Sequence, residues 1–347
     1  MSRREFLTAH DPHNMVGLVE DFPDQCRRAL AIAQSTPLPP GQPRPDNILV
    51  TGMGGSAAGG DFVAALFDDQ GRVPCQVNRD YSLPNWVGPG TLAFVCSYSG
   101  QTEETLAAFA DLRRRGAMPF VISSGGQISE IARQEGFPLI TIPGGQPPRS
   151  ALGYLLVPIV HVCAHFGLLS AVDWDAFFAV LDGVRAQCGP ENEASPTAEL
   201  AKNLHNRLIL LDGQGAAAAR VANRVKGQIN ENAKRMAFAS AQPELCHNDI
   251  VGREGAHHQA AQWATVALYV SEVSAKMLTR SQVTARLTEG TMTTYELCAP
   301  GQTLFERMVG LAYIGDWLSL DLAALGQEDP TAIKSIDTLK AELARVP

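Results

Sequence analysis

The chain has 347 residues, of which 45% are hydrophobic, and a formal net charge of −8. This length is enough for two domains with buried cores, because one domain usually takes about 100–200 residues. The net negative charge and the lack of a run of Lys or Arg argue against a nucleic-acid partner. A few local hydrogen-bond donors nevertheless suffice to bind a small anion in an acidic protein.

The first half of the chain predicts alternating strands and helices. Apolar residues at helical spacing predict a first helix over residues 14–34, and a proline-rich loop follows over residues 37–45. Short apolar runs then predict strands at 48–51, 73–77, 91–97, 118–124 and 138–143. Amphipathic runs predict helices from Ser56, over 102–116 and over 128–136. This alternation predicts a parallel, doubly wound sheet.

A second α/β region follows the first. A buried connecting helix is predicted at 151–169, and a polar stretch at 189–197 marks a domain boundary. Residues 207–238 predict a strand, a glycine turn and a long helix. Later runs predict strands at 264–271 and 293–297, a helix at 304–325 and a tail helix from about Thr331.

The two regions indicate an internal duplication of one fold unit. Their glycine turns, at 52–58 and 213–219, hold matching places after a buried strand and before a helix. We therefore expect a first domain over 1–155, a connecting helix and linker over 156–194, and a second domain over 195–347.

The cysteines and the N-terminal residues indicate the cellular compartment of the protein. The seven cysteines are scattered at positions 26, 75, 96, 163, 188, 246 and 298 and include no CxxC pair, which predicts buried free thiols in a reducing cytoplasm and no structural zinc. The N-terminal residues are polar and lack the apolar core of a signal peptide. The sequence has no run of about 18 apolar residues, which a membrane span would need. We expect a cytoplasmic protein without a membrane partner.

A hydroxyl-rich turn follows the strand at 91–97. Ser97, Ser99 and Thr102 surround Gly100, which lets the backbone turn closely. Hydroxyls and the free amides of a helix N-terminus bind a phosphate without an arginine, and the glycine turn at 54–60 would supply a second such terminus. The alternative, in which the hydroxyls cap a helix, stays open.

Two nucleotide-binding motifs are disfavoured. The chain has no GxxxxGK[ST] loop. Residues 52–57 match the dinucleotide pattern G-x-G-x-x-A, but the acidic residue that this pattern requires about 20 positions later is missing, because Asp80 comes too late and lies in a loop.

A second polar cluster, at 230–252, predicts acid–base chemistry. Glu231 ends an alanine-rich helix, and His247 falls in a loop; a carboxylate and an imidazole suit proton transfer at a carbon next to a carbonyl. Arg149, held between prolines and an apolar helix, would stabilise an enolate oxygen. A solvated helix end, a turn cap and a surface ion pair are the open alternatives. His257 and His258 are adjacent and predict no metal site.

These motifs resemble the bifunctional phosphoglucose/phosphomannose isomerase family, a branch of the sugar isomerase (SIS) domain proteins. The resemblance covers most of the chain and runs through GMGGSAAGGDF, SYSGQTEET, PPRSALGY, KGQINENAKRMAF and PELCHNDIVG. It implies an α/β fold with two doubly wound, flavodoxin-like parallel-sheet SIS domains plus N- and C-terminal helices. It also implies a homodimer with shared active sites that needs no cofactor and no metal.

The resemblance further implies aldose–ketose isomerisation of hexose 6-phosphates. Glucose 6-phosphate would be converted to fructose 6-phosphate, and the preference between glucose and mannose epimers stays open. Glu231 would move a proton between C1 and C2, Arg149 would stabilise the cis-enediolate, and His247 would reach in from the partner subunit. Lys340 would lie beside the ring oxygen, with Lys334 as the competing choice. The implied phosphate ligands are Gly54, Gly55, Ser56, Ser97, Ser99 and Thr102.

Two other functions remain as alternatives. A sugar-phosphate sensor could share this fold, but the sequence offers no basic helix-turn-helix module for it. A glutamine-dependent amidotransferase needs a nucleophilic cysteine at the mature N-terminus, where residues 2–6 read SRREF.

Overall fold

The structure is a computed structural model that describes residues 1–39, 45–343 and 345. Most of the predicted proline-rich loop, residues 40–44, lies outside the described residues. Contacts group the chain into two compact units, which we name by their sheets. The sheet A unit comprises Asp21–Asp182 and Gly301–Met308, and the sheet B unit comprises Met1–Glu20, Gly183–Pro300 and Val309–Pro347.

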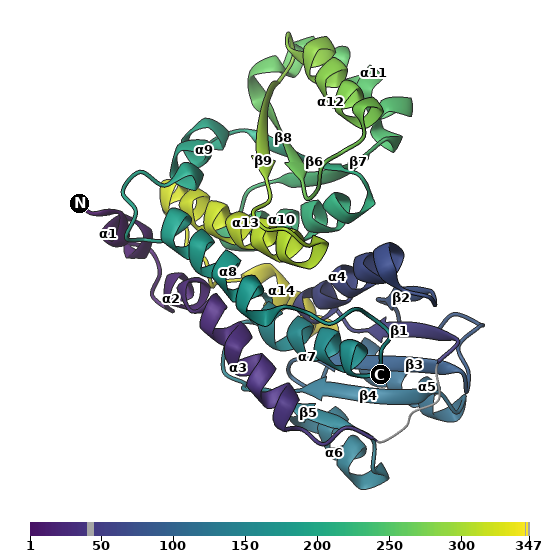
Figure 1. Cartoon of the computed structure of the whole chain (residues 1–347). Coiled ribbons are helices and arrows are strands. Elements are labelled where there is room, and N and C mark those ends of the chain that lie inside the picture. The colour runs from purple at the N-terminus through teal and green to yellow at the C-terminus, as the bar shows by residue number, and fades with distance from the viewer. Residues whose placement is uncertain (40–44, 344, 346–347) are drawn as a thin grey trace. The chain divides into compact units, whose positions relative to one another are not determined.

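The sheet A unit is a five-stranded parallel sheet with helices on both faces (Figure 1). Its strand order is β2-β1-β3-β4-β5. The elements are α3 (Phe22–Ser35), β1 (Asn47–Thr51), α4 (Gly54–Gln70), β2 (Cys75–Asn78), β3 (Thr91–Ser97), α5 (Glu103–Arg114), β4 (Met118–Ser123), α6 (Gly126–Glu135), β5 (Leu139–Thr141), the 3-10 helix η1 (Pro148–Ser150), α7 (Leu152–His165) and most of α8 (Trp174–Cys188).

The core of this unit lies on both sides of sheet A. Leu49 and Val95 pack with Phe109 of α5 in one apolar cluster. On the other face, a Cβ added to Gly60 of α4 would meet Cγ1 of Val50 at 2.8 Å, so the helix lies directly on the strand. Strands buried on both faces are continuous apolar runs, which is why the sequence predicts them well.

The sheet B unit is a four-stranded parallel sheet with the order β7-β6-β8-β9. This order repeats β2-β1-β3-β4 of sheet A and agrees with the predicted duplication. The elements are α1 (Arg3–Thr8), α2 (Met15–Glu20), α9 (Pro196–Leu204), β6 (Leu208–Gln214), α10 (Ala216–Ala233), β7 (Ala237–Gln242), η2 (Glu244–His247), α11 (Asp249–Glu254), η3 (His257–Gln262), β8 (Trp263–Tyr269), α12 (Ala275–Thr288), β9 (Thr293–Cys298), most of α13 (Leu304–Gly326) and α14 (Lys334–Leu343). The predicted α/β class with two parallel sheets is confirmed.

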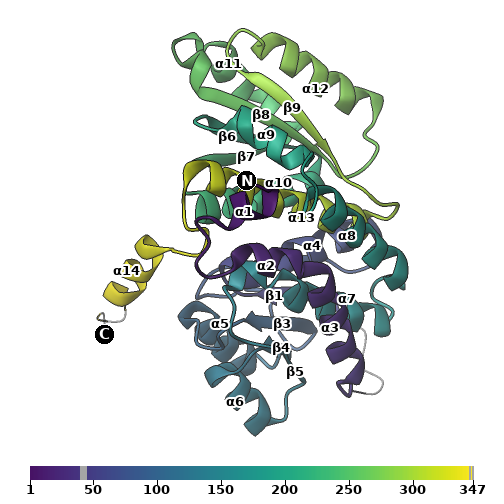
Figure 2. The ribbon, with the colours of Figure 1, turned by 90° about the vertical axis from the view of Figure 1, so that its left-hand side faces the viewer.

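Helix α13 packs on α10 in the sheet B unit (Figures 1 and 2). The guanidinium of Arg224 pairs with Asp316 at 3.2 Å, and Asn232 Nδ2 donates to Ser319 Oγ at 2.9 Å. Contrary to the expectation from the sequence, α13 is long and apolar enough to cross a membrane. Its apolar stretch is 94% buried in the structure, as in the core helix of a globular fold.

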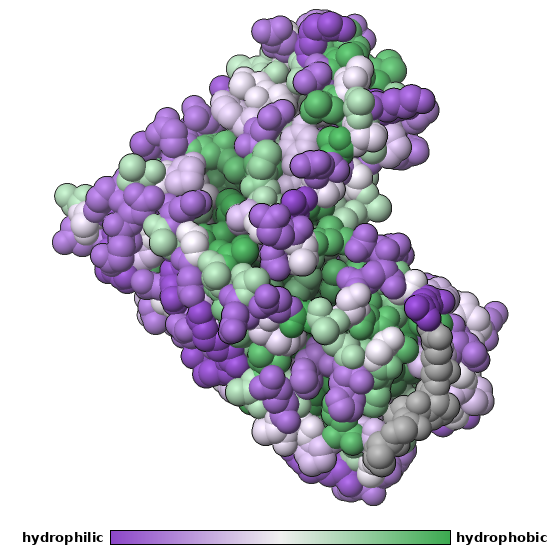
Figure 3. Space-filling model, viewed as in Figure 1, coloured by the Kyte–Doolittle hydropathy of each residue, from purple (hydrophilic) through white to green (hydrophobic). Residues whose placement is uncertain are grey.

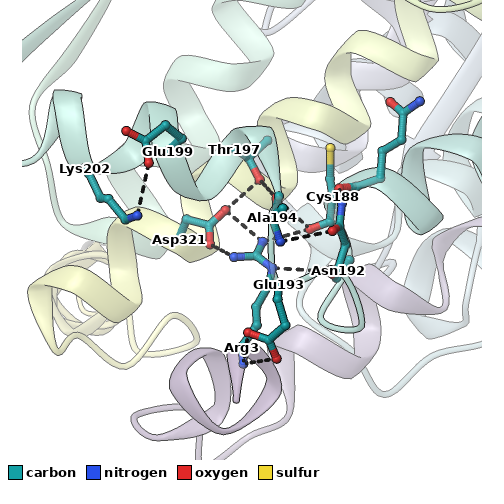
Figure 4. A network of polar contacts seen from close by, with 12 residues as sticks. Arg3, Cys188, Asn192, Glu193, Ala194, Thr197, Glu199, Lys202 and Asp321 are labelled. Atoms are coloured by element: carbon teal, nitrogen blue, oxygen red, sulfur yellow. Dashed lines mark hydrogen bonds and ion pairs between the residues drawn. The ribbon is translucent and has the colours of Figure 1, made fainter. Parts of the chain in front are cut away.

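Arg3 anchors the N-terminal segment inside the same unit (Figure 4). Its guanidinium donates to Asp321 Oδ1 of α13 at 2.6 Å and to the carbonyls of Cys188 at 2.8 Å and Gly189 at 3.1 Å. Thr197 Oγ1 donates to the second oxygen of Asp321 at 2.7 Å. Arg3 and Asp321 are both buried, so this network joins the N-terminal segment, the 188–197 turn and α13.

The contact units differ from the predicted domain ranges 1–155, 156–194 and 195–347. Residues 1–20 group with sheet B, because Arg3 bonds to α13, and α7 groups with sheet A, because it packs on α3 and α4. Contact grouping does not establish which segments fold independently, so the predicted ranges remain a prediction.

Several predicted elements differ in extent from the observed ones. The predicted helix at 14–34 is two helices, α2 and α3, because Pro23 occupies the first turn of α3 and cannot continue a preceding helix. The tail helix begins at Lys334 rather than near Thr331. Strand β7 and helices α1, α8, α9, α11 and α12 were not predicted.

The cysteines are all free thiols. Cys26, Cys96, Cys163 and Cys188 are buried, and burial raises the pKa of Cys96 and of Cys188 to about 12. Cys298 is exposed, so the expectation of buried thiols is wrong for this residue.

Candidate functional site

The two predicted phosphate loops follow neighbouring strands of sheet A. Strand β1 pairs with β2 on one side and with β3 on the other, so the order of the strands reverses between β1 and β3. The glycine turn at 54–56 follows β1, and the hydroxyl loop at 97–102 follows β3. Ligands of open α/β sheets bind in the crevice at the carboxyl ends of such strands.

The hydroxyl loop is folded by its own side chains around Gly100, whose φ is +67°. Ser97 Oγ accepts from the Gly100 amide at 3.1 Å and donates to Thr102 Oγ1 at 3.2 Å. Ser99 is exposed, and its Oγ accepts from the Gln101 amide at 3.2 Å. The three predicted hydroxyls therefore lie in one tight loop.

Thr102 is the residue before the first turn of α5, but its side chain makes no capping hydrogen bond. The capping alternative is therefore wrong for Thr102. The first amides of a helix have no partner within the helix. The N-terminus of α5 thus keeps donors and the positive end of its dipole for a ligand.

A second loop, at 123–126, supports the hydroxyl loop and was not predicted to take part. A Cβ added to Gly100 would meet the carbonyl oxygen of Gly125 at 1.8 Å, so no other residue fits there. The Ile128 amide donates to the Gly100 carbonyl at 3.1 Å, and Ser124 Oγ donates to the Tyr98 carbonyl at 2.6 Å. Burial raises the pKa of Tyr98, whose hydroxyl accepts from the Gln146 amide.

The glycine turn contacts both the hydroxyl loop and η1. Ser56 Oγ accepts from the Tyr98 amide at 3.1 Å. A Cβ added to Gly55 would meet the Pro148 carbonyl oxygen at 2.7 Å, so only glycine allows this approach. Gly54 has a φ of +49°, which also favours glycine.

Arg149 lies on η1 and is only 4% exposed. Gln25 of α3 fixes the residues that follow: its Nε2 donates to the Ser150 carbonyl and its Oε1 accepts from the Gly153 amide, both at 2.9 Å. Sequence reasoning missed Gln25, although a glutamine on the apolar side of a helix is a signal of a buried polar contact. One neighbourhood of the sheet A unit thus holds seven predicted residues: Gly54, Gly55, Ser56, Ser97, Ser99, Thr102 and Arg149.

Glu231 lies in the last turn of α10, at the wall of a cavity of about 590 Å³ in the sheet B unit. The neighbouring Asn232 is fully buried against α13, which fixes the end of the helix. The cavity is also lined by other polar residues: Asn230, Lys234, Glu328, Asp329 and Ser335.

The C-terminal tail forms the other wall of this cavity. Lys234 Nζ donates to the carbonyls of Asn232, at 3.2 Å, and of Asp329. Lys334 lines the cavity, whereas Lys340 is not among its described lining residues. The two lysines lie six residues apart on α14, about 240° around the helix, so they point in different directions.

His247 ends the short helix η2 and is exposed. Leu245 of the same turn is 2% exposed and anchors the turn in the unit. Asn248 Nδ2 donates to Glu244 Oε1 at 3.1 Å, which fixes the chain on either side of the imidazole.

The two sets of side chains suit different chemical tasks. The group in the sheet A unit offers hydroxyls, helix-terminal amides and a guanidinium, which are donors for an anion. The cavity in the sheet B unit offers carboxylates and ammonium groups, which suit proton transfer. Within the part of the chain that the structure describes, no three His, Cys, Asp or Glu side chains gather as metal ligands.

Two family models match the two halves of the chain. The model described as the bacterial phospho-glucose isomerase C-terminal SIS domain matches residues 193–343. The SIS domain model matches residues 44–151, which include both predicted phosphate loops and Arg149.

Similar proteins extend the match over the whole chain. A crystal structure of a hypothetical protein from Thermus thermophilus is 18% identical, covers 99% of this chain and 93% of its own, and has a TM-score of 0.76, which shows a shared fold. The bifunctional phosphoglucose/phosphomannose isomerase of Thermoplasma volcanium is 31% identical over 86% of this chain and 92% of its own. That of Caldicellulosiruptor bescii is 37% identical over 94% of this chain and 98% of its own. Because this likeness covers both units, the chain belongs to the bifunctional phosphoglucose/phosphomannose isomerase family.

Proposed function

We propose that the protein interconverts the aldoses glucose 6-phosphate and mannose 6-phosphate with the ketose fructose 6-phosphate. The observation that carries this proposal is the likeness to a relative whose name states both activities and of which this chain covers 98%. The site residues named above supply the groups that such a reaction needs.

The phosphate of the substrate is proposed to bind at the hydroxyl loop. The tight loop around Gly100, the uncapped N-terminus of α5 and the glycine turn at the start of α4 support this assignment. A phosphate dianion gains charge-assisted hydrogen bonds from such donors, which are about twice as strong as neutral ones. The proposed ligands are Gly54, Gly55, Ser56, Ser97, Ser99 and Thr102.

Glu231 is proposed to act as the base in this reaction. In the open-chain aldose it takes the proton from C2, which leaves a cis-enediol(ate), and it returns a proton to C1 while the hydroxyl proton moves from O2 to O1. The product is the ketose, so the reaction needs no oxidant. Arg149 carries the positive charge that stabilises the enediolate oxygen.

We further propose a cytoplasmic homodimer in which His247 of one protomer assists ring opening in the partner's site. The exposure of His247 supports this assignment. So do apolar side chains on the surface of the same unit: Val251 is 71% exposed, Leu278 41% and Leu287 44%. Figure 3 shows apolar side chains among polar ones over α11 and α12. Exposed apolar groups of this kind favour a protein partner.

A coupled assay tests the proposed activity. Glucose 6-phosphate and mannose 6-phosphate are each supplied, and the fructose 6-phosphate formed is measured. Turnover of either sugar supports the isomerase. Binding of both sugars without turnover would favour the sensing alternative instead.

The hydroxyl loop gives a prediction about KM. We expect the double variant Ser99→Ala with Thr102→Ala to raise KM about 100-fold, because each hydrogen bond to a charged group contributes about 1.5–3 kcal/mol. Steady-state kinetics with fructose 6-phosphate measures it. The matched control is Ser35→Ala with Thr36→Ala, whose hydroxyls both bond to the Ile32 carbonyl at the end of α3. An unchanged KM in the loop variant would remove the phosphate assignment.

The two tail lysines give a prediction about kcat. The family motif supports Lys340 and the cavity supports Lys334, and we propose Lys340. We expect Lys340→Met to lower kcat about tenfold to 100-fold, through the loss of one charge-assisted hydrogen bond, and to lower it more than Lys334→Met does. Single-turnover rates of the two variants show which lysine contributes more to kcat. A larger loss in Lys334→Met would transfer the role to that residue.

A further inference from the structure

A cavity of about 460 Å³ opens at the amino-terminal ends of the sheet A strands β3 and β4. It is lined by Leu92 in the early part of β3 and by Met118 at the start of β4, whereas the phosphate loops follow the ends of the strands. The remaining walls come from Pro45, from the end of α4 with the residues just after it, and from the chain after α7. Its volume lies within the range of about 300–1,000 Å³ typical of small-molecule sites.

The inner wall of this cavity is apolar. Leu92 is 4% exposed, and Met118 and Phe166 are partly buried beside it. Apolar area that a ligand covers here gains about 25 cal/mol per Å². A hexose phosphate, whose carbons carry hydroxyls, would gain little from this wall, so the cavity does not suit the proposed substrate.

Two donor groups lie on the polar part of the wall. Gln70 Oε1 accepts from the Ser170 amide at 3.0 Å, which leaves both hydrogens of Gln70 Nε2 for another acceptor. Arg72 lines the same cavity and makes no hydrogen bond or ion pair with any residue among 1–39, 45–343 and 345.

Three backbone carbonyls at the ends of α7 and α4 are already engaged. At the end of α7 the Cys163 carbonyl accepts from the Leu168 amide at 2.8 Å, and the Ala164 carbonyl accepts from the Gly167 amide at 3.0 Å. At the end of α4 the Phe67 carbonyl accepts from the Gly71 amide at 2.9 Å. Gln70 and Arg72 remain as donors for a ligand, and Arg72 is cationic.

We propose that this cavity binds a small organic anion, with its carboxylate or phosphate on Arg72 and Gln70 and an apolar group against Leu92, Met118 and Phe166. The apolar wall provides binding area, and the guanidinium and the amide fix the orientation of the charged end. This site is separate from the proposed hexose-phosphate site, and its ligand belongs to a different chemical class.

Calorimetry with benzoate as the probe tests the proposal on the full chain. Benzyl alcohol serves as the uncharged comparison. We expect benzoate to bind more tightly than benzyl alcohol, and Arg72→Gln to weaken benzoate binding at least about tenfold, because a hydrogen bond to a charged group contributes about 1.5–3 kcal/mol. The matched control is Arg133→Gln, an exposed arginine of α6 outside the cavity.

A second variant separates a lost contact from a damaged fold. Ser170→Trp places an indole at the exposed rim of the cavity, where it should block benzoate while the melting temperature stays near that of the unmodified protein. Glucose 6-phosphate should not displace benzoate. Failure of benzoate to bind, equal binding in Arg72→Gln and Arg133→Gln, or displacement by glucose 6-phosphate would each overturn the proposal.

Discussion

We expect Glu231→Gln to lower kcat by about 10²–10⁴-fold with little change in the affinity for the sugar phosphate. The amide keeps the size of the side chain in the last turn of α10 but cannot accept a proton, and general base catalysis typically contributes a factor of about this size. Steady-state kinetics give kcat, and calorimetry with fructose 6-phosphate gives the affinity.

A loss of kcat at unchanged affinity distinguishes the loss of a catalytic group from damage to the fold. A variant that merely disturbed the fold would lose both, whereas removal of the proposed base should leave the proposed phosphate contacts in place. Glu289→Gln is the matched control, because Glu289 is an exposed carboxylate of the same unit outside the cavity. Near-normal turnover in Glu231→Gln would exclude Glu231 as the base.

Elements that are buried on both faces could be predicted from the sequence. Some elements that are buried on one face only were missed. All seven residues of β3 are buried, and their continuous apolar run predicts a strand. Strand β7, at the edge of sheet B, has the sequence AFASAQ with only its two end residues buried, so it lacks the apolar run of a central strand. Helix α12 reverses the usual pattern, since Ser281, Thr284 and Thr288 are buried while Leu278 is 41% exposed.

The candidate site could be predicted where a short motif contains its own chemistry. The hydroxyls of Ser97, Ser99 and Thr102 come within six residues, and the structure folds them into one loop. Gln25 was missed because its contact, the Ser150 carbonyl, lies 125 positions away in the chain. The choice between Lys334 and Lys340 depends on which side of α14 faces Glu231, and that direction is not encoded in composition or spacing.

The network around Arg3 gives the prediction with the largest expected effect on stability. We expect Arg3→Met to lower the free energy of unfolding of the sheet B unit by about 3–5 kcal/mol, because it leaves Asp321 buried without its cation. The carbonyls of Cys188 and Gly189 lose donors as well. Urea unfolding followed by fluorescence measures the change.

Arg4→Met is the matched control in the adjacent position. Arg4 pairs with Glu20 and Glu191 at the surface, where its side chain is 44% exposed, and exposed pairs contribute about 0–1 kcal/mol. Changing Arg3 to Met and Asp321 to Leu together removes both charges and should recover part of the loss, since apolar replacement of a buried pair is often tolerated. If Arg3→Met proved no more costly than Arg4→Met, the N-terminal segment would not be held to α13 by this buried ion pair.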